Sequence, residues 1–115
     1  MEIATSQDDS IRVLKLTGRL DQASADNFHQ ALIPHLNDCS ANGKPLLLDF
    51  SGVEYISSVG LRVMILAAKQ VKAQNGRVAI ANLTPIVAEV FQIGRFNLVF
   101  QVFQNIEDAL KFLNQ

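Results

Sequence analysis

The sequence predicts an α/β fold in which a single layer of mixed, mostly parallel β-sheet, with about four to five strands, packs against about four α-helices. Three observations predict it: apolar and polar residues alternate near the N-terminus, an apolar run occupies residues 46–50, and helical spacing separates the strand-like segments. Such a run is typical of a central strand covered on both faces. The 115 residues, 49% of them hydrophobic, are expected to form one domain, residues 1–115.

The first predicted strand covers residues 11–17, where apolar and polar side chains alternate, and it ends at Gly18. Residues 2–7 are one candidate for its partner, in a hairpin closed by the turn Asp8-Asp9-Ser10. The chain is therefore expected to begin with extended structure.

A first helix is predicted over residues 23–39, because Phe28, Leu32 and Leu36 recur every four residues, as on one helix face. Pro34 lies inside this segment and has no backbone N–H to donate. Either the last turn of the helix kinks there, or the segment consists of two short helices.

The middle of the chain predicts a strand, a helix and a strand. Asn42-Gly43-Lys44-Pro45 indicates a loop before the apolar strand at residues 46–50. A second helix is expected from about residue 58 to residue 74, closed by Asn75-Gly76, and residues 77–81 form the next strand.

The C-terminal third predicts two further helices on either side of a last strand. Thr84 followed by Pro85 indicates an N-cap and a first turn, and Gly94 is a plausible stop for this short helix. Residues 96–103 are aromatic and β-branched enough for the last strand. Asn105 then caps a final helix that runs through residue 113.

The composition excludes several classes of partner and site. Ten basic residues against eleven acidic ones give a net charge of −1, without the positive field that nucleic-acid binding needs. Residues 1–9 do not resemble a signal peptide, and the longest apolar stretch is broken by Arg62 and Lys69, so no membrane segment is expected. Cys39 stands alone and is interpreted as a buried small residue. A cytoplasmic protein is the expectation.

The usual catalytic sets are missing from the sequence. His29 and His35 lie six residues apart, on opposite faces of a helix, so a shared metal is not expected. The six glycines are scattered and do not form a phosphate-binding loop. Asp49 ends an apolar strand near Ser58, but neither histidine lies where it could act as the base. The sequence therefore predicts no enzyme, no metal site and no cofactor.

One segment, residues 49–62, is unusual. It takes a buried strand through a short loop to Ser57 and Ser58, which open a helix. Helix N-termini carry unpaired amide donors and the positive end of the helix dipole, so a phosphate on a serine there would be stabilised locally. The alternative is that Ser57 or Ser58 simply caps the helix.

The helix that follows has only Arg62 as a charged residue between residues 59 and 68. Its apolar residues cover more of the circumference than one sheet-facing stripe requires. They are either buried under neighbouring helices or form a protein-docking patch with Met64 at its centre.

The ordered set of motifs resembles the STAS family, the sulfate-transporter and anti-sigma-factor-antagonist domains, and in particular the free-standing bacterial antagonists. The family's serine and Gly-Leu at a helix start correspond to Ser57-Ser58-Val59-Gly60-Leu61. The resemblance continues in Gly18-Arg19-Leu20-Asp21, Leu48-Asp49-Phe50-Ser51 and Glu107-Asp108-Ala109-Leu110, and so spans nearly the whole chain.

The resemblance implies a STAS-like fold and a regulator that binds an anti-sigma factor and so frees a sigma factor. The anti-sigma factor would be a serine kinase that phosphorylates Ser58, with Ser57 as the runner-up, and a serine phosphatase would reverse the modification. Ser57 stands where the family often has aspartate, and Val59 replaces a hydroxyl or smaller residue. The partner-binding residues expected on this basis are Asp21, Ser57, Ser58, Val59, Gly60, Leu61, Arg62, Met64 and Ile65.

Two rival functions remain open from the sequence. One is a STAS scaffold or transporter-accessory subunit that is never phosphorylated. The other is a small-ligand or nucleotide-binding domain, or an enzyme, with a site at the strand ends. The expected oligomeric state is a monomer or a weak dimer, with no nucleic acid and no membrane as partners.

Overall fold

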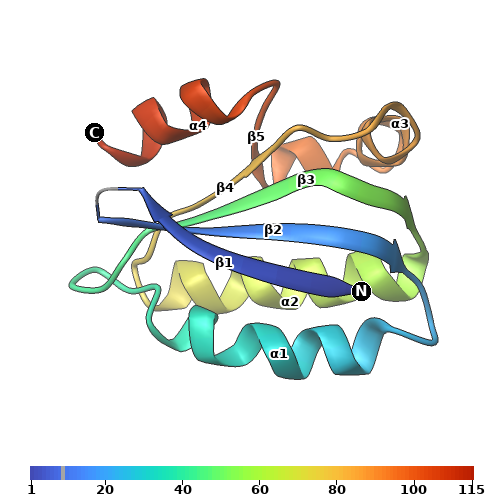
Figure 1. Ribbon diagram of the computed structural model, residues 1–115, viewed down its shortest axis with the longest axis horizontal. Helices are drawn as coiled ribbons and strands as arrows, with labels where there is room; N and C mark the ends of the chain where they lie inside the picture. The colour runs from blue at the N-terminus through green and yellow to red at the C-terminus, as the bar shows by residue number, and fades with distance from the viewer. Residues whose placement is uncertain (9) are drawn as a thin grey trace.

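Five strands form one sheet whose spatial order follows the sequence, in the residues 1–8 and 10–115 that the computed structural model describes (Figure 1). β1 is antiparallel to β2, and every later neighbour is parallel. The α/β fold with a mixed, mostly parallel sheet is therefore confirmed. The strands are β1 (Glu2–Asp8), β2 (Ile11–Leu20), β3 (Leu46–Ile56), β4 (Val78–Ala81) and β5 (Gln101–Phe103).

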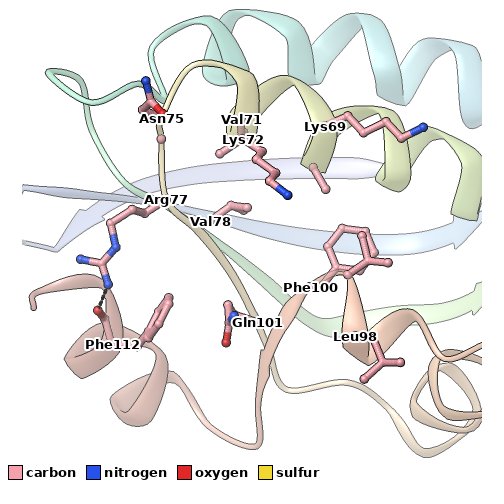
Figure 2. Close-up of a pocket in the computed structure, with 13 residues that line it drawn as sticks. Lys69, Val71, Lys72, Asn75, Arg77, Val78, Leu98, Phe100, Gln101 and Phe112 are labelled. Atoms are coloured by element: carbon pink, nitrogen blue, oxygen red, sulfur yellow. Dashed lines mark hydrogen bonds between the residues drawn. The ribbon is translucent and has the colours of Figure 1, made fainter.

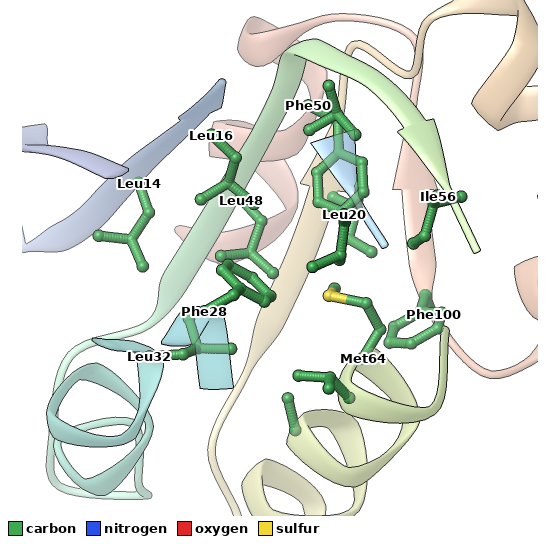
Figure 3. Close-up of a cluster of buried hydrophobic side chains, with 14 of the residues drawn as sticks. Leu14, Leu16, Leu20, Phe28, Leu32, Leu48, Phe50, Ile56, Met64 and Phe100 are labelled. Atoms are coloured by element: carbon green, nitrogen blue, oxygen red, sulfur yellow. The ribbon is translucent and has the colours of Figure 1, made fainter. Parts of the chain in front are cut away.

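Four α-helices and one short 3-10 helix, within the same residues, pack on this sheet. Helices α1 and α2 cover one face, α4 covers part of the other, and α3 lies beside the end of β3 (Figure 1). The main core lies between the sheet and α1 and α2 (Figure 3). A smaller cluster lies under α4. The helices are α1 (Ala25–Asn37), α2 (Ser58–Ala73), α3 (Pro85–Ile93), η1 (Phe96–Leu98) and α4 (Ile106–Leu113).

Strand β2 is longer than predicted, because it continues through Gly18 to Leu20. Gly18 has φ of +117°, a conformation that side chains with a Cβ rarely adopt. Register shifts relative to β3 occur between Lys15 and Thr17 and between Gly18 and Arg19. The glycine that was expected to end the strand instead lets the strand bulge and continue.

Strand β3 also extends further than predicted, because residues 51–56 are strand rather than loop. After the bulge, β2 pairs with β3 again up to Leu20 and Ile56. Val53 and Ile56 are buried, so the strand is held by its core contacts as well as by pairing. Asp49 consequently lies within the strand and does not end it, and its carboxylate accepts hydrogen bonds from the Ser51 backbone and the Asn82 amide.

Helix α1 is one continuous helix through Pro34, so the alternative of two short helices is wrong. Pro34 lies in the last turn of α1. The one backbone hydrogen bond that proline cannot donate is therefore lost only near the end of the helix. Phe28, Leu32 and Leu36 are buried as their spacing predicted.

The predicted strand over residues 96–103 is mostly wrong, since only Gln101–Phe103 is strand and Phe96–Leu98 forms η1. Arg95 has φ of +58° and turns the chain before η1. The rings of Phe96 and Phe100 then pack against Phe91 of α3. Aromatic residues that suit a strand are used here to cover a helix.

The other local predictions have mixed outcomes. The hairpin of β1 and β2 is confirmed, while Asp9 in its expected turn lies outside the described residues. Asn105 caps α4, as predicted, through a hydrogen bond that its side chain accepts from the Asp108 N–H. Thr84 is the N-cap residue of α3, but its hydroxyl donates to the Val53 carbonyl 2.8 Å away and so ties α3 to β3.

Cys39 is buried, as predicted, and burial raises the pKa of its thiol. In the part of the chain that the structure describes, no helix is both long enough and apolar enough to cross a membrane.

Candidate functional site

Helix α2 begins directly after β3, and Ser57 is its N-cap. The Ser57 hydroxyl accepts a hydrogen bond from the Gly60 N–H at 3.1 Å, and its carbonyl accepts one from the Leu61 N–H at 2.8 Å. Capping of this kind satisfies a backbone donor that the helix itself leaves unpaired. The capping interpretation is therefore confirmed for Ser57.

Ser58 is the first residue of α2 and is exposed. Its hydroxyl makes no hydrogen bond to any residue that the structure describes. The two adjacent serines thus differ in one chemical respect: the hydroxyl of Ser57 is engaged by the backbone, whereas the hydroxyl of Ser58 is open to a second molecule.

The start of α2 is joined to the end of β2. The Ser57 N–H donates to the Leu20 carbonyl at 2.9 Å. Gly60 also packs closely against Leu20. A Cβ atom at position 60 would lie 2.7 Å from the Leu20 Cγ and 2.7 Å from the Leu20 carbonyl oxygen. This close approach brings the turn that begins at Asp21 to the same end of the sheet as Ser57 and Ser58 (Figure 1).

We expect Gly60→Ala to lower the free energy of unfolding by about 1–3 kcal/mol. Alanine favours helix over glycine by about 1 kcal/mol, but the new methyl group must displace the Leu20 backbone. Urea denaturation followed by circular dichroism measures the change. The control is Val59→Ala, which alters the same turn at an exposed side chain and should have little effect. Equal stability of Gly60→Ala and wild type would show that the contact is not tight.

Asp21 organises the turn between β2 and α1. Its carboxylate accepts hydrogen bonds from the N–H groups of Ala23 and Ser24, and it lies 3.6 Å from the Arg19 guanidinium. Burial by itself raises the pKa of the Asp21 carboxyl, but hydrogen bonds from the Ser24 backbone and hydroxyl and from Ala23, together with Arg19, hold this pKa below its ordinary value. The structure therefore gives Asp21 a role in shaping the turn.

The lowered pKa of Asp21 predicts a pH dependence of stability. The contribution of the ionised carboxylate is fully present above its unfolded pKa of about 3.9 and is lost as the pH falls through the lower folded pKa. Asp21→Asn should thus be less stable than wild type near neutral pH, and the difference should narrow below about pH 4. Thermal melts over a pH series measure this difference. A gap of the same shape for Glu89→Gln, an exposed position in α3, would show that the effect does not belong to Asp21.

Two residues beside Asp21 were missed as site candidates. Arg19 and Tyr55 are partners across β2 and β3, and the Arg19 guanidinium lies 4.5 Å from the centre of the Tyr55 ring. The contact depends on the shifted register after Gly18, which the local pattern of either strand does not reveal. Arg19 therefore joins the Asp21 turn to the surface of β3.

The apolar residues of α2 divide between the core and the surface. Met64 is wholly buried and points between Leu20 and Phe100, so its predicted place at the centre of a docking patch is wrong (Figure 3). Gly60 and Leu61 are also buried, the latter 7% exposed, and Ile65 is half-buried. These residues support the surface from beneath, because the sheet and α1 cover that side of α2.

Between residues 58 and 66, the exposed residues of α2 are Ser58, Val59, Arg62 and Leu66. Val59 is 37% exposed and Leu66 is 46% exposed, and Arg62 lies one turn after Ser58. We call these four residues the α2 surface. It combines a free hydroxyl, one positive charge and two apolar side chains, which suits contact with another protein.

The family model that describes STAS domain sequences matches residues 2–109 of this chain. The chain belongs to the STAS family. A relative of this STAS domain is BtrV of Bordetella bronchiseptica, a candidate anti-sigma factor antagonist, which is 31% identical over 109 residues. The match covers 95% of this chain and 91% of BtrV.

Solved structures of anti-sigma factor antagonists have the same fold as this STAS domain. A candidate anti-sigma factor antagonist of Thermotoga maritima has a TM-score of 0.87 at 20% identity, and the match covers 98% of this chain and 95% of that one. The anti-sigma factor antagonist SpoIIAA, unphosphorylated, has a TM-score of 0.75 at 17% identity over 98% and 96% of the two chains. The structure of SpoIIAA of Bacillus in its phosphorylated form has a TM-score of 0.67 at 16% identity, over 96% and 97%.

Proposed function

We propose that this STAS domain is an anti-sigma factor antagonist that acts in the cytoplasm. It binds an anti-sigma factor, and phosphorylation of Ser58 prevents that binding. The name of BtrV, which is 31% identical, supports the class of function. SpoIIAA, a protein of the same fold, has been solved with and without phosphate, and this supports the type of regulation.

The observation that carries the choice of residue is the different use of the two serine hydroxyls. The Ser57 hydroxyl accepts a hydrogen bond from the Gly60 N–H, so its oxygen must leave this cap before a kinase can phosphorylate it. Loss of such a cap costs about 1 kcal/mol. Ser58 is exposed at the first position of α2 and makes no competing hydrogen bond among the described residues. A kinase can reach its hydroxyl without disturbing the helix.

The α2 surface explains how a phosphate could act without refolding the domain. Phosphorylation adds about −1.5 to −2 charges at Ser58, next to the apolar side chain of Val59. The helix dipole and Arg62 stabilise that charge while the surface is in water. A partner that covers Val59 and Leu66 would have to strip water from the phosphate. Changing from about 99% bound to about 1% bound requires roughly 5.5 kcal/mol of differential affinity, which a desolvated dianion can supply.

The chemistry of the switch belongs to the partners in this proposal. An anti-sigma factor with serine kinase activity transfers the γ-phosphoryl group of ATP to the Ser58 oxygen and releases ADP, and a serine phosphatase hydrolyses the phosphoserine. This chain contributes the acceptor hydroxyl and the α2 surface. Asp21 holds the adjoining turn in place through its hydrogen bonds to Ala23 and Ser24.

The test is to isolate the chain with its bound proteins from the cells that produce it and to map phosphate by mass spectrometry. We expect two populations: unmodified chain in complex with an anti-sigma factor, and chain free of that partner with phosphate on Ser58. Phosphate on Ser57 in its place would overturn the assignment of the residue. Phosphate on Ser58 in the complexed population would overturn the proposed direction of the switch.

A further inference from the structure

A groove of about 690 Å³ lies at the other end of α2, far from Ser58 (Figure 2). The C-terminal half of α2 forms one wall, and η1 with the residues after it forms the other. The first residues of β4 and β5 and Phe112 of α4 complete it. Ser58 and Lys72 are fourteen residues apart on one helix, which corresponds to about 21 Å along its axis. A molecule in this groove would not touch Ser58, although Leu66 of the α2 surface lies only three residues before Lys69.

The groove is positively charged. Its lining contains Lys69, Lys72 and Arg77 and no carboxylate side chain, although the whole chain has a net charge of −1. Lys69 and Lys72 lie three residues apart on α2 and are exposed. Neither ammonium group forms an ion pair with any residue that the structure describes.

Arg77 has a separate structural use. Its guanidinium donates to the carbonyls of Phe112, Leu113 and Gln115 at the end of α4, and it stacks over the Phe112 ring (Figure 2). Cations at the C-terminus of a helix are stabilising. The charge that a second molecule could use is therefore that of Lys69 and Lys72.

The opposite wall of the groove is apolar and exposed. Leu98 is 77% exposed and Val99 is 54% exposed, whereas the neighbouring Phe100 is buried and anchors this wall to the core. Figure 2 shows the two lysines on α2 on one side and Leu98 with Phe100 on the other. Exposed apolar side chains with polar residues around them are typical of a protein-binding surface.

We propose that this groove, which we call the lysine groove, binds an acidic segment of a partner protein that also carries an apolar side chain. The carboxylates of the segment would contact Lys69 and Lys72, and its apolar side chain would cover Leu98 and Val99. The charge of the lining selects an acidic partner over a basic one, and the apolar wall selects a peptide over a simple anion. Because the groove lies away from Ser58, binding there does not depend on the switch.

The test uses the full chain and a fluorescent synthetic peptide that alternates glutamate with leucine and phenylalanine, followed by fluorescence anisotropy. Lys69→Glu is expected to weaken binding about fivefold, which is the effect of turning an attractive exposed pair into a repulsive one. Leu98→Ser should weaken it by a similar factor. Lys15→Glu, which reverses one exposed charge on β2, is the matched control and should bind as wild type does. Thermal melts check that the variants are folded.

Other outcomes would overturn the proposal. Equal binding of a peptide with serine in place of every leucine and phenylalanine would indicate a general anion surface. Equal weakening by Lys15→Glu would indicate an effect of net charge alone. Self-association of the wild type that Leu98→Ser abolishes would make a second copy the occupant. Ser58→Asp should bind the peptide normally, so failure here and failure of the phosphorylation switch can be told apart.

Discussion

Ser58→Asp is expected to weaken binding of the anti-sigma factor by at least about a hundredfold, which corresponds to about 2.7 kcal/mol. The aspartate places a negative charge at the first position of α2, beside Val59, where the partner is proposed to exclude water. Aspartate carries one charge and phosphoserine carries about −1.5 to −2, so the variant should lose less affinity than the phosphorylated chain. Isothermal titration calorimetry with the purified anti-sigma factor measures the change.

Two controls make this result specific. Ser58→Ala removes the hydroxyl without adding charge, so it should bind as wild type does and should resist phosphorylation. Ser6→Asp adds the same charge at an exposed position of β1, the strand at one edge of the sheet, and should leave binding unchanged. Undiminished binding by Ser58→Asp would favour a scaffold that phosphorylation does not switch.

Phe91→Ala is expected to lower the free energy of unfolding by about 3–5 kcal/mol. Phe91 is 1% exposed and its ring contacts those of Phe50, Phe96 and Phe100 at centroid distances of 6.1, 6.1 and 5.7 Å. The substitution would leave a cavity at the point where α3 and η1 join β3. The midpoint of urea denaturation, followed by circular dichroism, measures the loss.

The control for this prediction is Ile93→Ala, two residues further along α3. Ile93 is 76% exposed, so its removal should change stability by less than about 0.5 kcal/mol. If both substitutions cost the same, the aromatic cluster would not be what holds α3 against the sheet. If Phe91→Ala unfolded α3 alone and left the rest of the domain folded, α3 would be a separately unfolding unit.

The elements that the sequence determined by itself are those whose signal lies within a few residues. Leu32 and its neighbours at four-residue spacing produce a helix with one buried face wherever that helix packs. The apolar run at 46–50 demands cover on both faces, and the structure supplies α1 and α2 on one side and α4 on the other. Asn105 caps α4 through an atom of its own side chain. The family resemblance likewise depended on short motifs, and these also identified the start of α2.

Tertiary contacts decided what a local pattern leaves open. Gly18 is an expected strand end, yet pairing with β3 makes it a bulge and creates the contact between Arg19 and Tyr55. The close approach of Gly60 to Leu20 sets how α2 is rotated about its axis, since each residue of a helix points about 100° away from the one before it. That rotation turns Met64 inward and leaves Ser58 outside.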